Sequence, residues 1–167
     1  MVLNSENVLK FIPSGLGEFG KLAQVGVDLS IKNITEIQPC GYLPQKGKAV
    51  IEEYKDINYS YNTSNNKVWK LEKGKVYSLT FHQTVKLDTE HCARVIGRSS
   101  TKRMGLLIES AIYDPAFESH KEGMGATAYS FYDCEIEEGA RIAQLVILNC
   151  ETAPEYDGDY KGNKDKL

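Results

Sequence analysis

Residues 76–87, VYSLTFHQTVKL, carry the clearest structural pattern in this chain of 167 residues. Five apolar side chains of this stretch occupy odd-numbered positions: Tyr77, Leu79, Phe81, Val85 and Leu87. Because successive side chains of a β-strand point to opposite faces, this spacing places all five on one face of an extended segment. The pattern predicts a half-buried strand with one face packed inward.

Similar short apolar runs recur along the chain, and glycines punctuate them. The runs span residues 27–31, 93–96, 106–112, 126–132 and 142–148, and the glycines stand at positions 41, 47, 74, 97, 105, 123, 125 and 139. Many short strands with regular turn signals are typical of β-barrels and β-sandwiches. We therefore predict an all-β fold.

Length and composition fit one folded domain with a short arm. Apolar residues make up 41% and charged residues 26% of the sequence, which excludes a disordered, collagen-like or coiled-coil chain. We assign residues 1–153 to a single domain. Residues 154–167, PEYDGDYKGNKDKL, lack apolar periodicity and predict a mobile arm. Residues 58–66, NYSYNTSNN, predict an exposed hairpin tip or loop.

Charge and spacing exclude several classes of partner. The net charge is −3 without a long basic block, and no apolar run approaches the ~20 residues that span a bilayer. We expect neither nucleic acid nor a membrane as partner, and a cytoplasmic location. Cysteines and histidines are too scattered for a zinc ribbon or a local metal site, so we expect free thiols and satisfied or exposed imidazoles: Cys40, Cys92, Cys134, Cys150, His82, His91 and His120.

The segment with the most specific chemistry is GRSSTKR, residues 97–103, which follows the apolar run 93–96. If Ser100 caps a short helical turn, free backbone N–H groups, the hydroxyls of Ser99 and Ser100 and the guanidinium of Arg98 converge on one point. Such a point would suit a triphosphate. A solvated turn with an N-cap serine explains the same residues equally well.

Four segments together resemble a known family. Residues 24–29 (QVGVDL), 97–106 (GRSSTKRMGL), 109–117 (ESAIYDPAF) and 139–146 (GARIAQLV) are similar, in this order, to the four motifs of the dUTPase/dCTP deaminase superfamily. The resemblance implies a distorted, jelly-roll-like β-barrel with a short helix after the GRSS segment. It also implies a homotrimer with active sites between subunits and a deoxynucleoside triphosphate as substrate.

The resemblance assigns the catalytic role to Asp114. In the family, the aspartate at this position orients or deprotonates the water that attacks the α-phosphorus, a task suited to a carboxylate. Local sequence alone favours an ordinary Asp-Pro turn there. Phe117 matches the aromatic residue that packs on the deoxyribose and excludes a 2′-hydroxyl, although a core phenylalanine is the plain alternative.

Substrate binding is assigned in the same way. Arg98, Ser99, Ser100 and Gln144 correspond to groups that hold phosphates, and Arg103 to one that helps with phosphates or with the base-reading hairpin. That hairpin uses mainly backbone groups, here of Ser110, Ala111, Ile112 and Tyr113. Asp28 would act through the water ligands of Mg²⁺, the implied cofactor, although it could equally be a strand-edge residue. Arg141 has a structural or intersubunit role.

The arm also has a counterpart in the deaminase-like branch of the family. Residues 156–162, YDGDYKG, resemble its Tyr-x-Gly-x-Tyr-Gln-Gly ending, so Tyr156 and Tyr160 are candidates for a lid over the nucleotide. A purely solvated tail is the alternative. The glycine-rich fifth motif of common trimeric dUTPases is absent, and Ser119 replaces a usual glycine.

The reaction follows from one position. Family deaminases carry a catalytic glutamate on the strand after the third motif, and alignment across an insertion near residues 120–125 puts Ser130 there. A hydroxyl cannot shuttle protons near neutral pH, and residues 126–132 contain no glutamate. We therefore predict hydrolysis of dUTP to dUMP and pyrophosphate. The rivals are a dCTP deaminase, alone or bifunctional, and a regulatory nucleotide-binding trimer that catalyses little.

Overall fold

The computed structural model describes residues 1–38, 41–46, 54–119, 121 and 123–151. Strands dominate, and every helix is a single short turn. The elements are α1 (Ser5–Val8), η1 (Leu9–Phe11), β1 (Lys21–Leu22), β2 (Val27–Ile37), β3 (Tyr54–Asp56), β4 (Tyr59–Tyr61), β5 (Lys67–Leu71), β6 (Val76–Phe81), β7 (His91–Gly97), α2 (Ser99–Arg103), β8 (Leu106–Glu109), β9 (Gly125–Ser130), β10 (Cys134–Glu137) and β11 (Arg141–Asn149).

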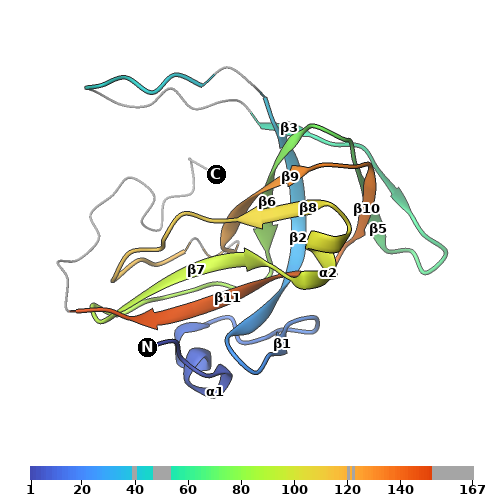
Figure 1. Ribbon diagram of the computed structural model, residues 1–167. Helices are drawn as coiled ribbons and strands as arrows, with labels where there is room; N and C mark the ends of the chain where they lie inside the picture. Colours follow the sequence, from blue (N-terminus) through green and yellow to red (C-terminus); the bar gives the residue numbers. More distant parts are fainter. Residues whose placement is uncertain (39–40, 47–53, 120, 122, 152–167) are drawn as a thin grey trace.

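Six strands close into a barrel, which confirms the predicted all-β fold (Figure 1). Around the ring the order is β2, β11, β7, β8, β9 and β6, and β6 pairs with β2 to complete it. Each of these pairings is antiparallel. Closure leaves the six strands without an open edge, so their register is fixed on both sides. The short strands β1 and β3 add to β2.

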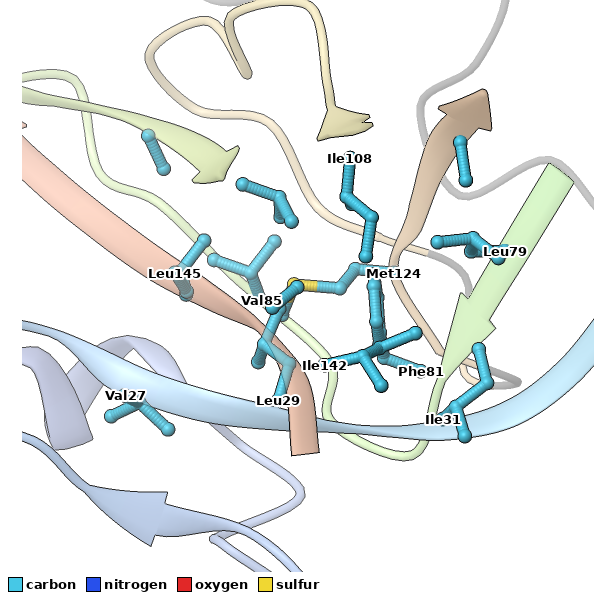
Figure 2. Close-up of a cluster of buried hydrophobic side chains, with 14 of the residues drawn as sticks. Val27, Leu29, Ile31, Leu79, Phe81, Val85, Ile108, Met124, Ile142 and Leu145 are labelled. Atoms are coloured by element: carbon cyan, nitrogen blue, oxygen red, sulfur yellow. The ribbon is translucent and has the colours of Figure 1, made fainter. Parts of the chain in front are cut away.

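The core fills the barrel, as the alternation in β6 predicts. Tyr77, Leu79 and Phe81 are buried, and Val85 and Leu87 are buried as well beyond the end of the strand. Figure 2 shows side chains from different strands converging on one another, with Met124 among them. Full burial of one such side chain is worth roughly 1.5–3 kcal/mol, so this cluster stabilises the ring of strands.

A separate three-stranded sheet, ordered β10-β5-β4, flanks the barrel. Its β4–β5 hairpin contains residues 58–66, and its turn is held by the Asn62 side chain, which accepts hydrogen bonds from the backbone N–H groups of Ser64 and Asn66. Tyr59 and Tyr61 are exposed. The predicted exposed hairpin is therefore confirmed.

The N-terminal segment packs on the barrel in a way that strand periodicity does not reveal. Leu3 donates its N–H to the Ile147 carbonyl, so the first residues extend alongside β11. Asn4 then caps α1 by accepting the N–H of Asn7. The segment continues with the buried side chains Val8, Phe11 and Ile12.

Two predicted strands are shorter than their apolar runs. The run 106–112 forms β8 only as far as Glu109, because Ser110 turns the chain and its hydroxyl accepts the N–H of Val95. The run 126–132 forms β9 as far as Ser130. Within the described part of the chain, no helix has the length and apolar character needed to cross a membrane.

Gly26 sets the position of the first motif on the sheet. Its φ is 75°, a left-handed conformation that favours glycine, and an added Cβ would lie 2.1 Å from the Leu145 carbonyl oxygen. This close approach lets β2 start directly against β11, with Asp28 opposite Gln144. The glycine of QVGVDL is thus needed for backbone geometry.

Candidate active site

Three of the four motifs meet where β2, β11 and β7 lie side by side. Gln144 of β11 pairs with Asp28 of β2 on one side and with Ile96 of β7 on the other. Arg98 follows directly after β7, next to the same stretch of β11. The first, second and fourth motifs therefore form one cluster within a single chain.

Two contacts fix the Arg98 guanidinium. One nitrogen lies 3.2 Å from Asp28 Oδ2, and the other donates to the Arg141 carbonyl at 2.7 Å. Asp28 is only 8% exposed, whereas the Arg98 side chain is 34% exposed, so the carboxylate is shielded while the guanidinium reaches solvent. A charge-assisted contact of this kind orients the guanidinium as well as stabilising the fold. Asp28 is therefore more than a strand-edge residue.

The helix α2 differs in detail from the sequence expectation. Arg98, in an extended conformation, is the N-cap residue, its side chain makes no capping hydrogen bond to the helix, and Ser100 lies inside the helix. The proposed Ser100 cap is therefore wrong, because β7 continues to Gly97 and the helix begins immediately afterwards. Ser99 and Ser100 are both exposed, as is Arg103 in the last turn. Ser99, Ser100 and Arg103 therefore lie at the solvent-facing side of the cluster formed by Asp28, Arg98 and Gln144.

Gln144 is half-buried, and its amide nitrogen donates to the carbonyl of Val25. This bond ties the fourth motif to the first, one residue before the close approach at Gly26. The structure thus brings Gln144 to the same cluster as Arg98, as the resemblance implies. In this chain alone, part of its hydrogen-bonding capacity is already used by the backbone.

The third motif begins beside this cluster, where Glu109 pairs with Ile96, but its second half lies elsewhere. Tyr113 pairs with Ala93, with N–H to carbonyl distances of 3.0 and 2.8 Å in the two directions. Arg98 stands five residues further along the strand, which at a rise of about 3.3 Å per residue is roughly 16 Å away. Asp114, next to Tyr113, therefore does not meet Arg98 within one chain.

Asp114 begins a turn that presents its side chain to solvent. The Phe117 N–H donates to the Asp114 carbonyl at 3.1 Å, and Ala116 has a φ of 61°. Asp114 is exposed. A positive φ is costly for alanine, so neighbouring contacts must hold this turn in place.

Those contacts come from residues 87–91. The Ala116 N–H donates to the Asp88 carbonyl, and the Phe117 carbonyl accepts from Leu87, both at 2.9 Å. The Asp88 carboxylate lies 2.6 Å from His91 Nδ1 and accepts the Glu90 N–H. Burial raises the pKa of Asp88, but these hydrogen bonds outweigh it and leave the pKa below its ordinary value. The sequence did not predict these contacts, since no local pattern links residues 87–91 with the turn of residues 114–117.

Aromatic residues anchor the same hairpin. The Tyr113 and Phe117 rings stack with centroids 4.9 Å apart, and the Tyr113 hydroxyl donates to the Gly125 carbonyl. Burial raises the pKa of Tyr113, so the phenol stays a neutral donor. Phe117 is half-buried against the core. Phe117 thus packs against the core while part of its ring stays accessible to solvent.

The remaining residues of the hairpin lie at the surface. Ala111 and Ile112 are exposed, and the Ser110 hydroxyl bridges to the Ala111 carbonyl at 2.6 Å. Tyr156 and Tyr160 lie outside the described residues. Ser119, where the family usually has glycine, is buried and its hydroxyl accepts the Val85 N–H.

Ser130 has a structural place. It is fully buried at the end of β9 opposite Leu106, and its hydroxyl donates to the Tyr132 carbonyl at 2.7 Å. β9 itself, Gly125–Ser130, contains no carboxylate. The position aligned with the deaminase glutamate thus faces the interior of the barrel.

Scattered cysteines and histidines form no metal centre in the part of the chain described. No group of three His, Cys, Asp or Glu residues there could hold an ion. Cys92, Cys134 and Cys150 are free thiols, as expected, and Cys40 and His120 lie outside the description. His82 departs from expectation: its Nε2 is buried without a hydrogen-bond partner among the described residues, and burial lowers the pKa of His82.

Replacement of Arg98 should destabilise the fold, because it removes the ion-pair partner of the buried Asp28 carboxylate. We expect Arg98→Met to lower the free energy of unfolding by about 1–3 kcal/mol, because Asp28 stays buried without its partner. Asp28→Asn in the same background should recover part of this loss. Arg94→Met is the matched control, since its pair with Glu109 is exposed and worth at most about 1 kcal/mol. Denaturant unfolding measures all four proteins, and equal costs for Arg94→Met and Arg98→Met would contradict the interpretation.

Comparison with known proteins identifies relatives over most of the chain. The family model for dCTP deaminase-like proteins matches residues 6–150. A probable deoxyuridine 5′-triphosphate nucleotidohydrolase of Aeropyrum pernix is 32% identical over 145 residues, which cover 86% of each chain. The deoxyuridine 5′-triphosphate nucleotidohydrolase of Methanocaldococcus jannaschii is 30% identical over 144 residues, or 85% of this chain and 88% of that protein.

A solved structure supports the fold independently of sequence. The 2′-deoxycytidine 5′-triphosphate deaminase of Agrobacterium tumefaciens matches with a TM-score of 0.60 at 14% identity, covering 87% of this chain and 46% of that chain. The match to the family model spans all four motifs and the whole closed ring of strands. The chain therefore belongs to the dCTP deaminase-like family.

Proposed function

We propose that this protein is a dUTP diphosphatase that hydrolyses dUTP to dUMP and pyrophosphate. The observation that carries the proposal is the convergence of Asp28, Arg98 and Gln144 from three motifs at one point. The two archaeal relatives described above, both named deoxyuridine 5′-triphosphate nucleotidohydrolases, support dUTP as the substrate.

We assign phosphate binding to the residues at and around α2. The oriented guanidinium of Arg98 and the exposed hydroxyls of Ser99 and Ser100 offer charged and neutral donors in three consecutive residues. Arg103 adds positive charge nearby, and Gln144 offers an amide from β11. Together these groups would hold the triphosphate and stabilise the charge that develops on the departing pyrophosphate.

Hydrolysis requires a base near the α-phosphorus, and we assign it to Asp114. Its exposed carboxylate can accept a proton from the attacking water, and the braced turn fixes its position. The hairpin backbone from Ser110 to Tyr113 would read the uracil edge, mainly at the exposed Ala111 and Ile112, because the Ser110 N–H and both backbone groups of Tyr113 are already bonded to β7. Phe117 would pack on the deoxyribose face and exclude a ribonucleotide sterically.

Mg²⁺ fits this donor set only as a cation held mainly by the substrate. Asp28 is the carboxylate of the cluster and is already paired with Arg98, so it would contact the ion through water. When bound, the ion would neutralise negative charge on the triphosphate and on the leaving pyrophosphate. Arg98, Ser99 and Ser100 would orient the phosphates in either case.

A complete site then needs a second copy of the chain. Within one chain the phosphate cluster and Asp114 are separated by roughly 16 Å along β7. We therefore propose a homotrimer in which Arg98, Ser99 and Ser100 of one subunit and Asp114 of another face the same nucleotide. We further propose that residues 1–153 form the barrel domain and that residues 154–167, with Tyr156 and Tyr160, act as a lid.

Deamination of dCTP is the weaker alternative. A deaminase needs a carboxylate beside C4 of the base, and β9 carries the buried hydroxyl of Ser130 at the aligned position. A regulatory trimer that binds nucleotide without catalysis would need the same phosphate cluster. Products therefore separate the three functions better than binding does.

Product analysis is the direct test. We expect the protein to release dUMP and pyrophosphate from dUTP and no ammonia from dCTP. Ser130→Glu should not create deamination, because its side chain points into the barrel. Ammonia from dCTP would establish a deaminase or bifunctional enzyme, and nucleotide binding without either product would establish the regulatory alternative.

Asp114→Asn should separate chemistry from binding. We expect kcat to fall by about 10²–10⁴-fold, since the amide keeps the shape but loses the basic oxygen. Nucleotide affinity should stay within about tenfold. Asp56→Asn, the same change at an exposed position on β3, serves as control and should leave kcat unchanged. Equal losses of affinity and rate in Asp114→Asn would mean that Asp114 positions the substrate instead.

Mixing two inactive variants tests the shared site. Subunits carrying Arg98→Ala and subunits carrying Asp114→Asn, exchanged in equal amounts, should regain about a quarter of the wild-type activity per site, because that fraction of interfaces combines two intact halves. Each variant subjected alone to the same exchange is the control. An active monomer in light scattering, or no recovery after demonstrated exchange, would disprove the shared site.

A further inference from the structure

We propose that Thr101 is a positioning residue that fixes the GRSS segment on β11 and thereby sets the affinity for the triphosphate. The inference rests on the proposed function and extends it to a residue that faces away from the nucleotide. Thr101 is 2% exposed, whereas its helix neighbours Ser100 and Lys102 face solvent. Its effect on binding must therefore act through the groups that it holds.

The Thr101 hydroxyl joins two backbone carbonyls from different segments. Its Oγ1 lies 2.7 Å from the Arg98 carbonyl and 3.1 Å from the Ile142 carbonyl. A hydroxyl carries a single proton, which these two acceptors share. The side chain thus bridges Arg98, the N-cap residue of α2, and the neighbouring strand β11.

The Ile142 carbonyl is a common anchor for this region. It also accepts the Arg98 N–H at 3.2 Å, and the preceding carbonyl, of Arg141, accepts from the Arg98 guanidinium. Ile142 is the residue at which the pairing of β11 with β2 shifts its register. The backbone and the side chain of Arg98 are therefore both held by hydrogen bonds to two consecutive carbonyls of β11.

The space around Thr101 leaves its hydroxyl little freedom. An added Cβ on Gly97 would lie 3.3 Å from Thr101 Oγ1 and 3.4 Å from Ile108, so the side chain fills the hollow that the glycine leaves. A β-branched side chain also has few rotamers in a helix. Without the hydroxyl, α2 would keep its bonds from Arg98 N–H to Ile142 and from Lys102 N–H to Arg98 but lose the link between them.

This geometry predicts a selective effect on the phosphates. The hydroxyl controls the peptide between Arg98 and Ser99, and hence the direction of the guanidinium and of the following hydroxyls. Its two acceptors are the carbonyls of Arg98 and Ile142 rather than groups of the hairpin of residues 110–117, where base and sugar would bind. Loss of the hydroxyl should weaken binding of a triphosphate more than binding of the corresponding monophosphate.

The test uses Thr101→Val, which keeps the shape and removes the hydroxyl, with Thr101→Ser as the conservative control. Calorimetry measures binding of α,β-imido-dUTP and of dUMP to each protein. We expect Thr101→Val to bind the imido analogue about tenfold more weakly with dUMP affinity within about twofold, and Thr101→Ser to stay within about threefold of the wild type. In turnover of dUTP, KM should rise with kcat changed less.

The outcomes separate this inference from the proposed function. Equal losses for both ligands, unchanged affinity despite a lowered melting temperature, or failure of serine to restore binding would overturn the positioning role. If the valine variant folds poorly, Thr101→Ala gives the same comparison, because the ratio of the two affinities is taken within one folded sample. If the wild type neither binds the analogue nor hydrolyses dUTP, the proposed function itself fails, and the inference with it.

Discussion

The hydrogen-bonded ladder of β11 is the constraint on which the rest of the structure depends. This strand is paired along its length with β7 and at its start with β2, and it supplies carbonyls to Arg98 and Thr101 as well. Its side chains alternate, with Ala143, Leu145 and Ile147 buried inside the barrel and Gln144, between the first two, only half-buried. A slip of one residue would bury Gln144 and expose the apolar side chains, so packing of the core also fixes the site.

The sequence predicted features that depend on neighbouring residues and missed those that depend on pairing. Alternation in β6 is local, so its buried face could be read directly from residues 76–87. Closure of the barrel joins β2 to β6 across more than forty residues, and no short pattern encodes it. The Ser100 cap was wrong for a related reason: the first helical residue is decided by how far β7 stays paired with β11, which ends at Gly97.

The same distinction applies to the candidate site. Motif resemblance identified the residues that cluster around Arg98, but their meeting requires the left-handed conformation of Gly26 and the Asp28 ion pair. The distance between Arg98 and Asp114 follows from the pairing of Tyr113 with Ala93. The residue types at these two positions do not predict that pairing. Residues that support others, such as Asp88 outside the motifs and Thr101 inside the second one, are recognised only by their contacts.

The two halves of the proposed site are both attached to β7. β7 holds the turn of Asp114 near its beginning through Ala93 and leads into Arg98 at its end. A paired strand in a closed barrel is stiff, because it cannot shift without breaking ladder bonds on both sides. In an assembly where each site takes one half from each of two subunits, every subunit would contribute both halves to different sites. The stiffness of β7 would then fix the spacing between neighbouring sites.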